Sequence, residues 1–160
     1  MKKIILCLLL CFSVLGLSSC KITSYKDMKE LKYKNLLNQK ADNYYVVFYA
    51  VGCAYCAELE STVVNYAKYA KTNKDAYPIY VLNLSDKKKN AGINATNDNE
   101  YPNFLGTTNY EDIHFTTAPA LIMVSKGMVV RVISSKSTMR PMSEIKELLT
   151  SQMEDLYGNR

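Results

Sequence analysis

The sequence predicts an α/β domain, because its apolar runs form a strand–helix–strand unit, a hairpin and a closing helix. Residues 44–50 and 78–84 are predicted to be buried strands, and the helical pattern of residues 54–72 lies between them. Strands joined by a helix in this way pair in parallel through a right-handed crossover. Residues 120–124 and 128–133 are separated by a short turn with a glycine, which is typical of an antiparallel hairpin.

The first strand leads directly to a Cys-x-x-Cys pair. The strand is continuously apolar, as in a central strand covered on both faces, and it breaks at Gly52, just before Cys53. Cys56 shares one helical face with Leu59 and Val63, so it is expected to point toward the core. Cys53 is expected at the helix tip, where unsatisfied N–H groups and partial positive charge favour thiolate over thiol. The pattern predicts an exposed attacking cysteine, Cys53, and a sheltered resolving cysteine, Cys56.

This segment, with Ala54 and Tyr55 between the cysteines, resembles the active-site segment of the thioredoxin superfamily. The tyrosine before the second cysteine is more similar to glutaredoxins and periplasmic disulfide isomerases than to thioredoxin itself. The resemblance covers residues 43–156 and implies a mixed four-stranded sheet flanked by helices. It also implies thiol–disulfide exchange at Cys53 and Cys56, which needs no metal or organic cofactor.

A proline opens the third predicted strand, which resembles the cis-proline segment of thioredoxins. In that family the proline packs beside the cysteine pair, and the backbone of the preceding residue pairs with the substrate peptide. The resemblance therefore implies a cis peptide bond between Ala118 and Pro119. It also implies substrate contacts at Ala54, Tyr55, Ala118 and Pro119.

The chain departs from the thioredoxin pattern at the positions that handle the proton of the resolving thiol. Thioredoxins usually carry a buried aspartate six residues before the first cysteine, and here that residue is Val47. The lysine that often accompanies it falls near Val81, and the tryptophan before the first cysteine is replaced by Gly52. The proton relay of reducing thioredoxins is therefore expected to be absent, which leaves the direction of electron flow open.

Residues 1–19 have the pattern of a secretory signal peptide, with two lysines before an apolar run and small residues at its end. The closing Leu-Ser-Ser-Cys, which ends at Cys20, resembles the lipobox of bacterial lipoproteins, in which the cysteine becomes the lipidated first residue of the mature chain. We therefore expect a lipid-tethered N-terminal segment and helix over residues 20–42 and the thioredoxin-like domain over residues 43–160. The protein is expected outside the cytoplasm, anchored to the bacterial cell membrane by Cys20. An ordinary signal peptide with an incidental cysteine and an uncleaved anchor are the alternatives.

Three further segments complete the predicted chain. Helices are expected over residues 24–40, with Ser24 as the cap, and over about residues 143–156. Residues 85–117 form an extended polar segment before the proline strand, with a short helix expected near residues 103–105 or 86–91. This segment is either functional or a surface insertion without a role. His114, at its end, lies in no recognised motif and is distant in sequence from the cysteines.

Composition and cysteine count restrict the classes of function that remain. Without residues 1–19 the chain keeps 141 residues, enough for one domain, and its net charge of +3 is too small to indicate nucleic-acid binding. One Cys-x-x-Cys and one distant histidine do not supply the four ligands of a zinc site. With Cys7 and Cys11 removed and Cys20 acylated, only Cys53 and Cys56 are left to pair with each other. A monomer is expected.

The predicted function is that of a membrane-tethered extracytoplasmic thiol–disulfide oxidoreductase. Its expected partners are exported cysteine-containing proteins, a membrane redox partner that recycles the cysteine pair, and the membrane itself through the lipid anchor. Two alternatives remain open. One is a non-redox thioredoxin-like accessory or binding lipoprotein, for example in peptide or bacteriocin export, and the other is a structural lipoprotein with an inert disulfide.

Overall fold

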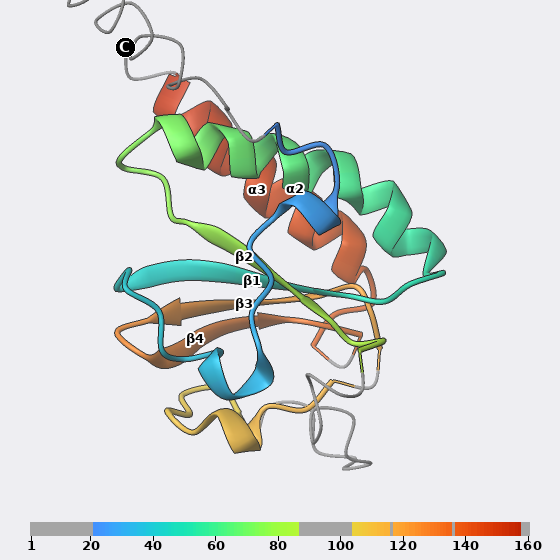
Figure 1. The fold of residues 1–160 in the computed structure, drawn as a ribbon, viewed down its shortest axis with the longest axis vertical. Coiled ribbons are helices and arrows are strands. Elements are labelled where there is room, and N and C mark those ends of the chain that lie inside the picture. Colours follow the sequence, from blue (N-terminus) through green and yellow to red (C-terminus); the bar gives the residue numbers. More distant parts are fainter. Residues whose placement is uncertain (1–20, 87–103, 116, 136, 158–160) are drawn as a thin grey trace, which may run out of the picture.

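The computed structural model describes residues 21–86, 104–115, 117–135 and 137–157. Within these residues the chain forms a four-stranded sheet in the order β2-β1-β3-β4 (Figure 1). Its strands are β1 (Asn43–Tyr49), β2 (Ile79–Asn83), β3 (Ala120–Ser125) and β4 (Met128–Ile133), and its two α-helices are α2 (Ala54–Thr72) and α3 (Pro141–Tyr157). β1 and β2 pair in parallel across α2, whereas β1 with β3 and β3 with β4 pair antiparallel. The predicted thioredoxin-like α/β fold, with its mixed four-stranded sheet flanked by helices, is confirmed.

Strand β1 is the central element because both of its faces are buried. Successive side chains of a strand point to opposite faces of the sheet. Those of β1 alternate between two cores, with Tyr45, Val47 and Tyr49 in one and Tyr44, Val46 and Phe48 in the other. Helices α2 and α3 lie side by side over the first of these faces (Figure 1). This double burial explains why the strand is continuously apolar, as the sequence predicts.

The N-terminal segment differs from its prediction. Instead of one helix over residues 24–40, the structure has two 3-10 helices, η1 (Tyr25–Asp27) and η2 (Tyr33–Asn35), joined by extended chain. Between them Glu30 forms a parallel bridge with Val81 of β2, and the Leu31 N–H donates to the Val81 carbonyl at 2.8 Å. The segment thus covers part of the open edge of β2, which would otherwise leave backbone groups unpaired. Ser24 does precede a helix, but only the single turn of η1.

The described portion of the extended polar segment contributes to the second core. Phe104, Ile113 and Phe115 have no exposed surface, and the ring centroids of Phe115 and Phe48 lie 4.2 Å apart. Residues 104–106 form a turn, so the short helix expected near residues 103–105 is wrong there. A 3-10 helix, η3 (Tyr110–Asp112), follows instead. Residues 87–91 of the other expected short helix lie outside the described residues. Phe104, Ile113 and Phe115 therefore pack in the second core, while residues 105–112 are exposed or half-buried.

The hairpin and α3 match their predicted bounds to within two residues. Lys126 and Gly127 turn the chain between β3 and β4, both with positive φ angles of 50° and 77°. α3 begins at Pro141, two residues earlier than expected, because a proline fits the first turn of a helix, where its missing N–H has no partner to lose. Ile145 and Leu149 bury this helix against the core that it shares with α2. Neither helix in the described ranges has the length and apolar character needed to cross a membrane.

Candidate active site

The cysteine pair lies at the junction between β1 and α2. Gly52 adopts a φ of +80° in the turn after β1, a conformation that residues with a Cβ rarely take. Cys53 is the N-cap residue of α2, and it forms a disulfide with Cys56 in the first turn of the helix. The predicted strand, turn and helix therefore deliver both cysteines to one end of the sheet.

The two sulfur atoms have different surroundings. The Cys56 N–H donates to Cys53 Sγ at 3.1 Å, and Cys53 is half-buried at the helix terminus. In the reduced protein this N–H and the helix terminus would stabilise a thiolate on Cys53. Cys56 has an exposed fraction of only 2% and packs in the core with Leu59 and Val63. This contrast agrees with the predicted division into an accessible and a sheltered cysteine.

Two valines lie in the core that holds Cys56. Val47 and Val81 are direct partners across the parallel β1–β2 pair, and both have no exposed surface. They stand at the positions where the thioredoxin resemblance implies an aspartate and a lysine. Apart from tyrosines, Ser134 is the only buried residue with a polar or charged side chain among the described residues. The described surroundings of Cys56 thus supply no buried carboxyl, amino or imidazole group.

Tyr25 is a neighbour of the site that sequence analysis missed. Its hydroxyl donates to the Cys56 carbonyl at 3.1 Å, its backbone N–H donates to Glu60 at 2.7 Å, and its ring stacks on Tyr49 at 4.6 Å between centroids. Burial, with a smaller contribution from the negative charge of Glu60, raises the pKa of Tyr25 well above its ordinary value. Its hydroxyl therefore stays protonated. The only signal in the sequence was Ser24 as a cap, which gives no indication of contact with Cys56.

The proline segment lies beside the cysteines. The Ala118–Pro119 peptide bond is cis, the isomer that the resemblance implies. The Ala118 carbonyl oxygen lies 3.5 Å from Cys53 Sγ, although these residues are 65 positions apart in the sequence. Ala118, the buried Pro119 and the exposed Tyr55 line one cavity of about 470 Å³. Ala54, the fourth residue expected to contact substrate, is exposed on the first turn of α2 but does not line this cavity.

The other predicted residues are not at this site or lie outside the described residues. Cys20 and the predicted signal segment belong to residues 1–20, which the structure does not describe. His114 is half-buried, and its neighbours Ile113 and Phe115 pack in the core on the opposite face of the sheet from Cys56. Within the described ranges, no group of three or more His, Cys, Asp or Glu side chains is placed to hold a metal ion.

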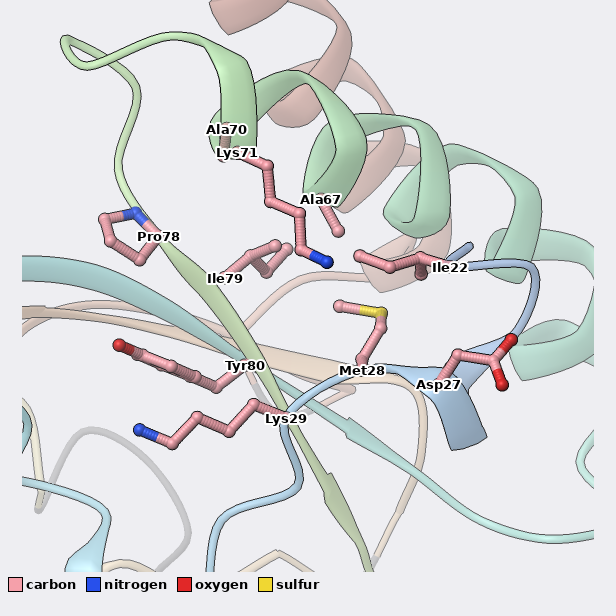
Figure 2. Close-up of a pocket in the computed structure, with 10 residues that line it drawn as sticks. All are labelled: Ile22, Asp27, Met28, Lys29, Ala67, Ala70, Lys71, Pro78, Ile79 and Tyr80. Atoms are coloured by element: carbon pink, nitrogen blue, oxygen red, sulfur yellow. The ribbon is translucent and has the colours of Figure 1, made fainter. Parts of the chain in front are cut away.

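A second cavity, of about 430 Å³, lies between α2 and the N-terminal segment, and it contains none of the predicted site residues. Figure 2 shows Lys71 reaching into it from α2, between the side chains of Ile22 and Ile79 and above Met28. The ammonium group of Lys29 instead lies over the Tyr80 ring, 4.8 Å from its centroid. The cysteine pair therefore lies near the cavity beside Pro119, through the contact of Cys53 with Ala118, and contributes no lining residue to this second cavity.

Neither a protein-family model nor a curated protein sequence matches the chain. Among solved structures it is similar to mitochondrial thioredoxin 3 from Saccharomyces cerevisiae in its oxidised form, with 12% identity and a TM-score of 0.46 over 75% of this chain and 97% of that chain. A structure on the thiol resolving mechanism of yeast mitochondrial 1-Cys peroxiredoxin via glutathione/thioredoxin systems matches with 12% identity and a TM-score of 0.45, over 76% and 99% of the chains. The J-Trx1 fragment of ERdj5 matches with 16% identity and a TM-score of 0.48, over 81% of this chain and 55% of that chain. At these identities and TM-scores, the similarities do not indicate the function of this chain. The thioredoxin-like fold follows instead from the sheet order and from the cysteine pair at the head of α2.

Proposed function

We propose that this chain is a thiol–disulfide oxidoreductase, tethered to the bacterial cell membrane outside the cytoplasm, that acts on cysteines of exported proteins. The asymmetry of the pair is the observation that carries the redox activity. Cys53 Sγ accepts an N–H bond at the head of α2 and lies next to a cavity, whereas Cys56 is buried behind it. An inert structural disulfide requires neither an open side nor a thiolate-stabilising donor.

The exchange proceeds through a mixed disulfide. The Cys53 thiolate attacks one sulfur of a substrate disulfide, the substrate S–S bond breaks, and the first substrate thiolate leaves. Cys56 then attacks Cys53 Sγ, which releases the second substrate thiolate and closes the Cys53–Cys56 disulfide. The cysteine pair loses two electrons and the substrate gains them, while the protons of the pair pass to the released thiolates. Oxidation of a substrate dithiol is the same sequence in reverse, and it needs a membrane redox partner to reoxidise the pair.

The reduction potential of the Cys53–Cys56 pair tests the redox activity. Equilibration of the purified protein with dithiothreitol buffers should give a potential above about −300 mV, since inert structural disulfides lie below that value. Thiol trapping in intact cells then gives the direction of electron flow. A mostly oxidised pair indicates a donor of disulfides, and a mostly reduced pair indicates a reductase or isomerase. A potential below about −300 mV would identify an inert disulfide and contradict the proposed activity.

The membrane tether is tested separately at Cys20. Because the Leu-Ser-Ser-Cys sequence follows a signal-like apolar run, Cys20→Ser should release the protein from membranes into the soluble extracytoplasmic fraction. Cys11→Ser, within the expected signal peptide, is the matched control and should leave the protein in the membrane fraction. Fractionation after a high-salt wash measures both. If the Cys20→Ser variant stays with the membranes, the lipid-anchor proposal is wrong.

A further inference from the structure

The cavity beside Pro119 lies near the sulfur atom of Cys53, which is not itself a lining residue. Ala118, whose carbonyl lies 3.5 Å from Cys53 Sγ, forms part of its wall together with Pro119 and Tyr55. Its volume of about 470 Å³ is within the range of pockets that enclose small ligands, so it has room for one large amino-acid side chain. When a substrate cysteine is joined to Cys53, a neighbouring residue of the same peptide is therefore within reach of this cavity.

Apolar side chains are unusually exposed at this cavity and in the turn before Cys53. Met139, Val51 and Tyr55 have exposed fractions of 99%, 71% and 63%, the largest among the large apolar residues that the structure describes. Tyr55 and Met139 line the cavity, and Val51 lies in the turn that leads to Cys53. Gathered apolar exposure of this kind marks a binding surface more often than an isolated exposed residue does.

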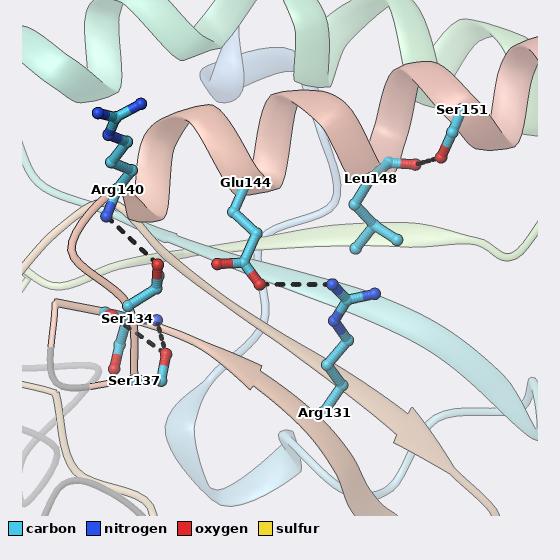
Figure 3. A network of polar contacts seen from close by, with 8 residues as sticks. Arg131, Ser134, Ser137, Arg140, Glu144, Leu148 and Ser151 are labelled. Atoms are coloured by element: carbon cyan, nitrogen blue, oxygen red, sulfur yellow. Dashed lines mark hydrogen bonds and ion pairs between the residues drawn. The ribbon is translucent and has the colours of Figure 1, made fainter.

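Ser135, Met139 and Arg140, which lie in the loop between β4 and α3, form part of the cavity wall. Within this loop the Ser134 N–H donates to Ser137 Oγ at 2.7 Å, and the Arg140 N–H donates to Thr138 Oγ1 at 3.3 Å (Figure 3). The side-chain hydroxyls of Ser135 and Thr117 also hydrogen-bond to each other, which joins the loop to the chain before Pro119. A wall held by its own hydrogen bonds loses little conformational entropy when a side chain enters.

The lining of the cavity carries positive charge. Arg140 is the one charged residue among the described residues that line it. The nearby carboxylate of Glu144 is paired with Arg131 at 3.4 Å, and Figure 3 shows the Arg140 guanidinium pointing away from this pair and from the loop hydrogen bonds. An acidic group on a bound peptide would therefore meet an opposite charge.

We infer that this cavity selects the substrate: it favours extended peptides in which the reacting cysteine has a large apolar neighbour and an acidic residue close by. This inference rests on the proposed oxidoreductase function and specifies its substrate class. The apolar neighbour enters between Tyr55 and Met139, and the acidic side chain pairs with Arg140. Small thiols, which lack such a side chain, gain nothing from the cavity.

Synthetic peptides test this selection. Each carries one cysteine as a mixed disulfide with a coloured aromatic thiol, and the reduced protein attacks the peptide sulfur and releases the coloured thiol. Peptides with leucine on both sides of the cysteine should react about tenfold faster than those with serine, the discrimination that one apolar pocket provides. A glutamate two positions from the cysteine should raise the rate about two- to fivefold over a lysine, and added salt should reduce this difference.

Two variants assign these preferences to the cavity. Met139→Ser should bring the leucine-to-serine ratio close to one, and Arg140→Gln should abolish the glutamate-to-lysine difference. Met128→Ser alters another exposed methionine, on the β-hairpin, and serves as the matched control that keeps both ratios. Equal rates for all peptides, or unchanged ratios in Met139→Ser and Arg140→Gln, would overturn the inference while leaving the oxidoreductase function standing. No release of coloured thiol from any peptide would overturn the oxidoreductase function itself, and the inference with it.

Discussion

At the scale of single residues, the two cysteine side chains stand three positions apart and meet opposite conditions. Cys53 precedes the first turn of α2 and receives the Cys56 N–H, whereas Cys56 lies in an apolar core one turn further on. The helix terminus acts mainly within its first turn, and apolar surroundings disfavour a thiolate. Both effects favour Cys53 as the attacking thiol and Cys56 as the resolving thiol of the proposed reaction.

Limited alkylation of the reduced protein should therefore modify Cys53 about tenfold faster than Cys56. Cys56→Ser should attack substrates without resolving the mixed disulfide, so it should accumulate disulfide-linked partners, and Cys53→Ser should accumulate few. Peptide mapping and non-reducing electrophoresis measure the two effects. Faster modification of Cys56, or trapping by Cys53→Ser alone, would reverse the assignment.

The residues of the site differ in how far the sequence could indicate them. Cys53 and Cys56 carry a local signal, because an apolar strand, a glycine turn and a helical pattern follow one another without a gap. Ala118 and Pro119 came only from the resemblance to thioredoxins, since nothing local links them to a cysteine 65 positions away. For Tyr25 and Met139, the sequence has no signal that links them to the cysteines. Their place at the site depends on how distant segments pack, which a single sequence does not encode as a pattern.

At the scale of elements, the N-terminal segment shows why the helix over residues 24–40 was predicted and why it does not form. Its apolar residues recur at short, helix-like intervals, but they serve two cores on opposite faces of the sheet. Ile22, Tyr25 and Met28 pack with α2, whereas Leu31, Tyr33 and Leu36 pack on the other face. The apolar face of a single straight helix cannot pack against both faces of a sheet. The chain therefore runs extended past the edge of β2 at Glu30. Tertiary burial here overrides local propensity.

The attachment of η1 to α2 gives a prediction for Tyr25→Phe. This change keeps the ring that stacks on Tyr49 and removes the hydroxyl that donates to the Cys56 carbonyl. Loss of one buried hydrogen bond should lower the free energy of unfolding by about 1 kcal/mol. Urea unfolding of the oxidised protein measures it. The control is Tyr110→Phe, which removes a solvent-exposed hydrogen bond to Glu111 and should change stability by less than about 0.5 kcal/mol. Equal changes in the free energy of unfolding for the two substitutions would show that the Tyr25 hydroxyl does not stabilise the contact between η1 and α2.

At the scale of the whole molecule, buried tyrosines contribute to both cores. The chain has 13 tyrosines and no tryptophan, and several of the tyrosines are almost fully buried: Tyr25, Tyr33, Tyr44, Tyr45 and Tyr66. Their hydroxyls reach backbone carbonyls where they can, as Tyr44 does at Leu36 and Tyr66 does at Tyr77. Burial, the largest cause in each case, raises the pKa of Tyr33 and Tyr44 to about 12 and also raises the pKa of Tyr45 and Tyr66. The fold is therefore linked to the protonation of its core tyrosines.

This linkage predicts that the protein unfolds at alkaline pH. A tyrosine in the unfolded chain loses its proton near pH 10, but the buried tyrosines keep theirs to higher pH. The unfolded state then binds fewer protons than the folded state, so the stabilisation is complete below about pH 10 and is lost as the pH rises toward 12. Each such tyrosine contributes a decline of roughly 1.4 kcal/mol per pH unit in that window. Urea midpoints of the oxidised protein from about pH 8 to about pH 11 should stay level at first and then fall, with tyrosinate absorbance appearing as the protein unfolds.

Tyr66→Phe isolates one contribution to this alkaline decline. The variant loses the hydrogen bond to the Tyr77 carbonyl at every pH, which lowers the whole stability curve by about 1 kcal/mol. Above pH 10 its curve should also fall less steeply than that of the unchanged protein, by roughly 1.4 kcal/mol per pH unit, because one ionisable group has been removed from the linkage. The difference between the two slopes is independent of the constant offset, so it reports on the ionisation of Tyr66 alone. Parallel curves above pH 10 would mean that Tyr66 ionises equally in the folded and unfolded states, which its complete burial between Tyr45 and Tyr69 argues against.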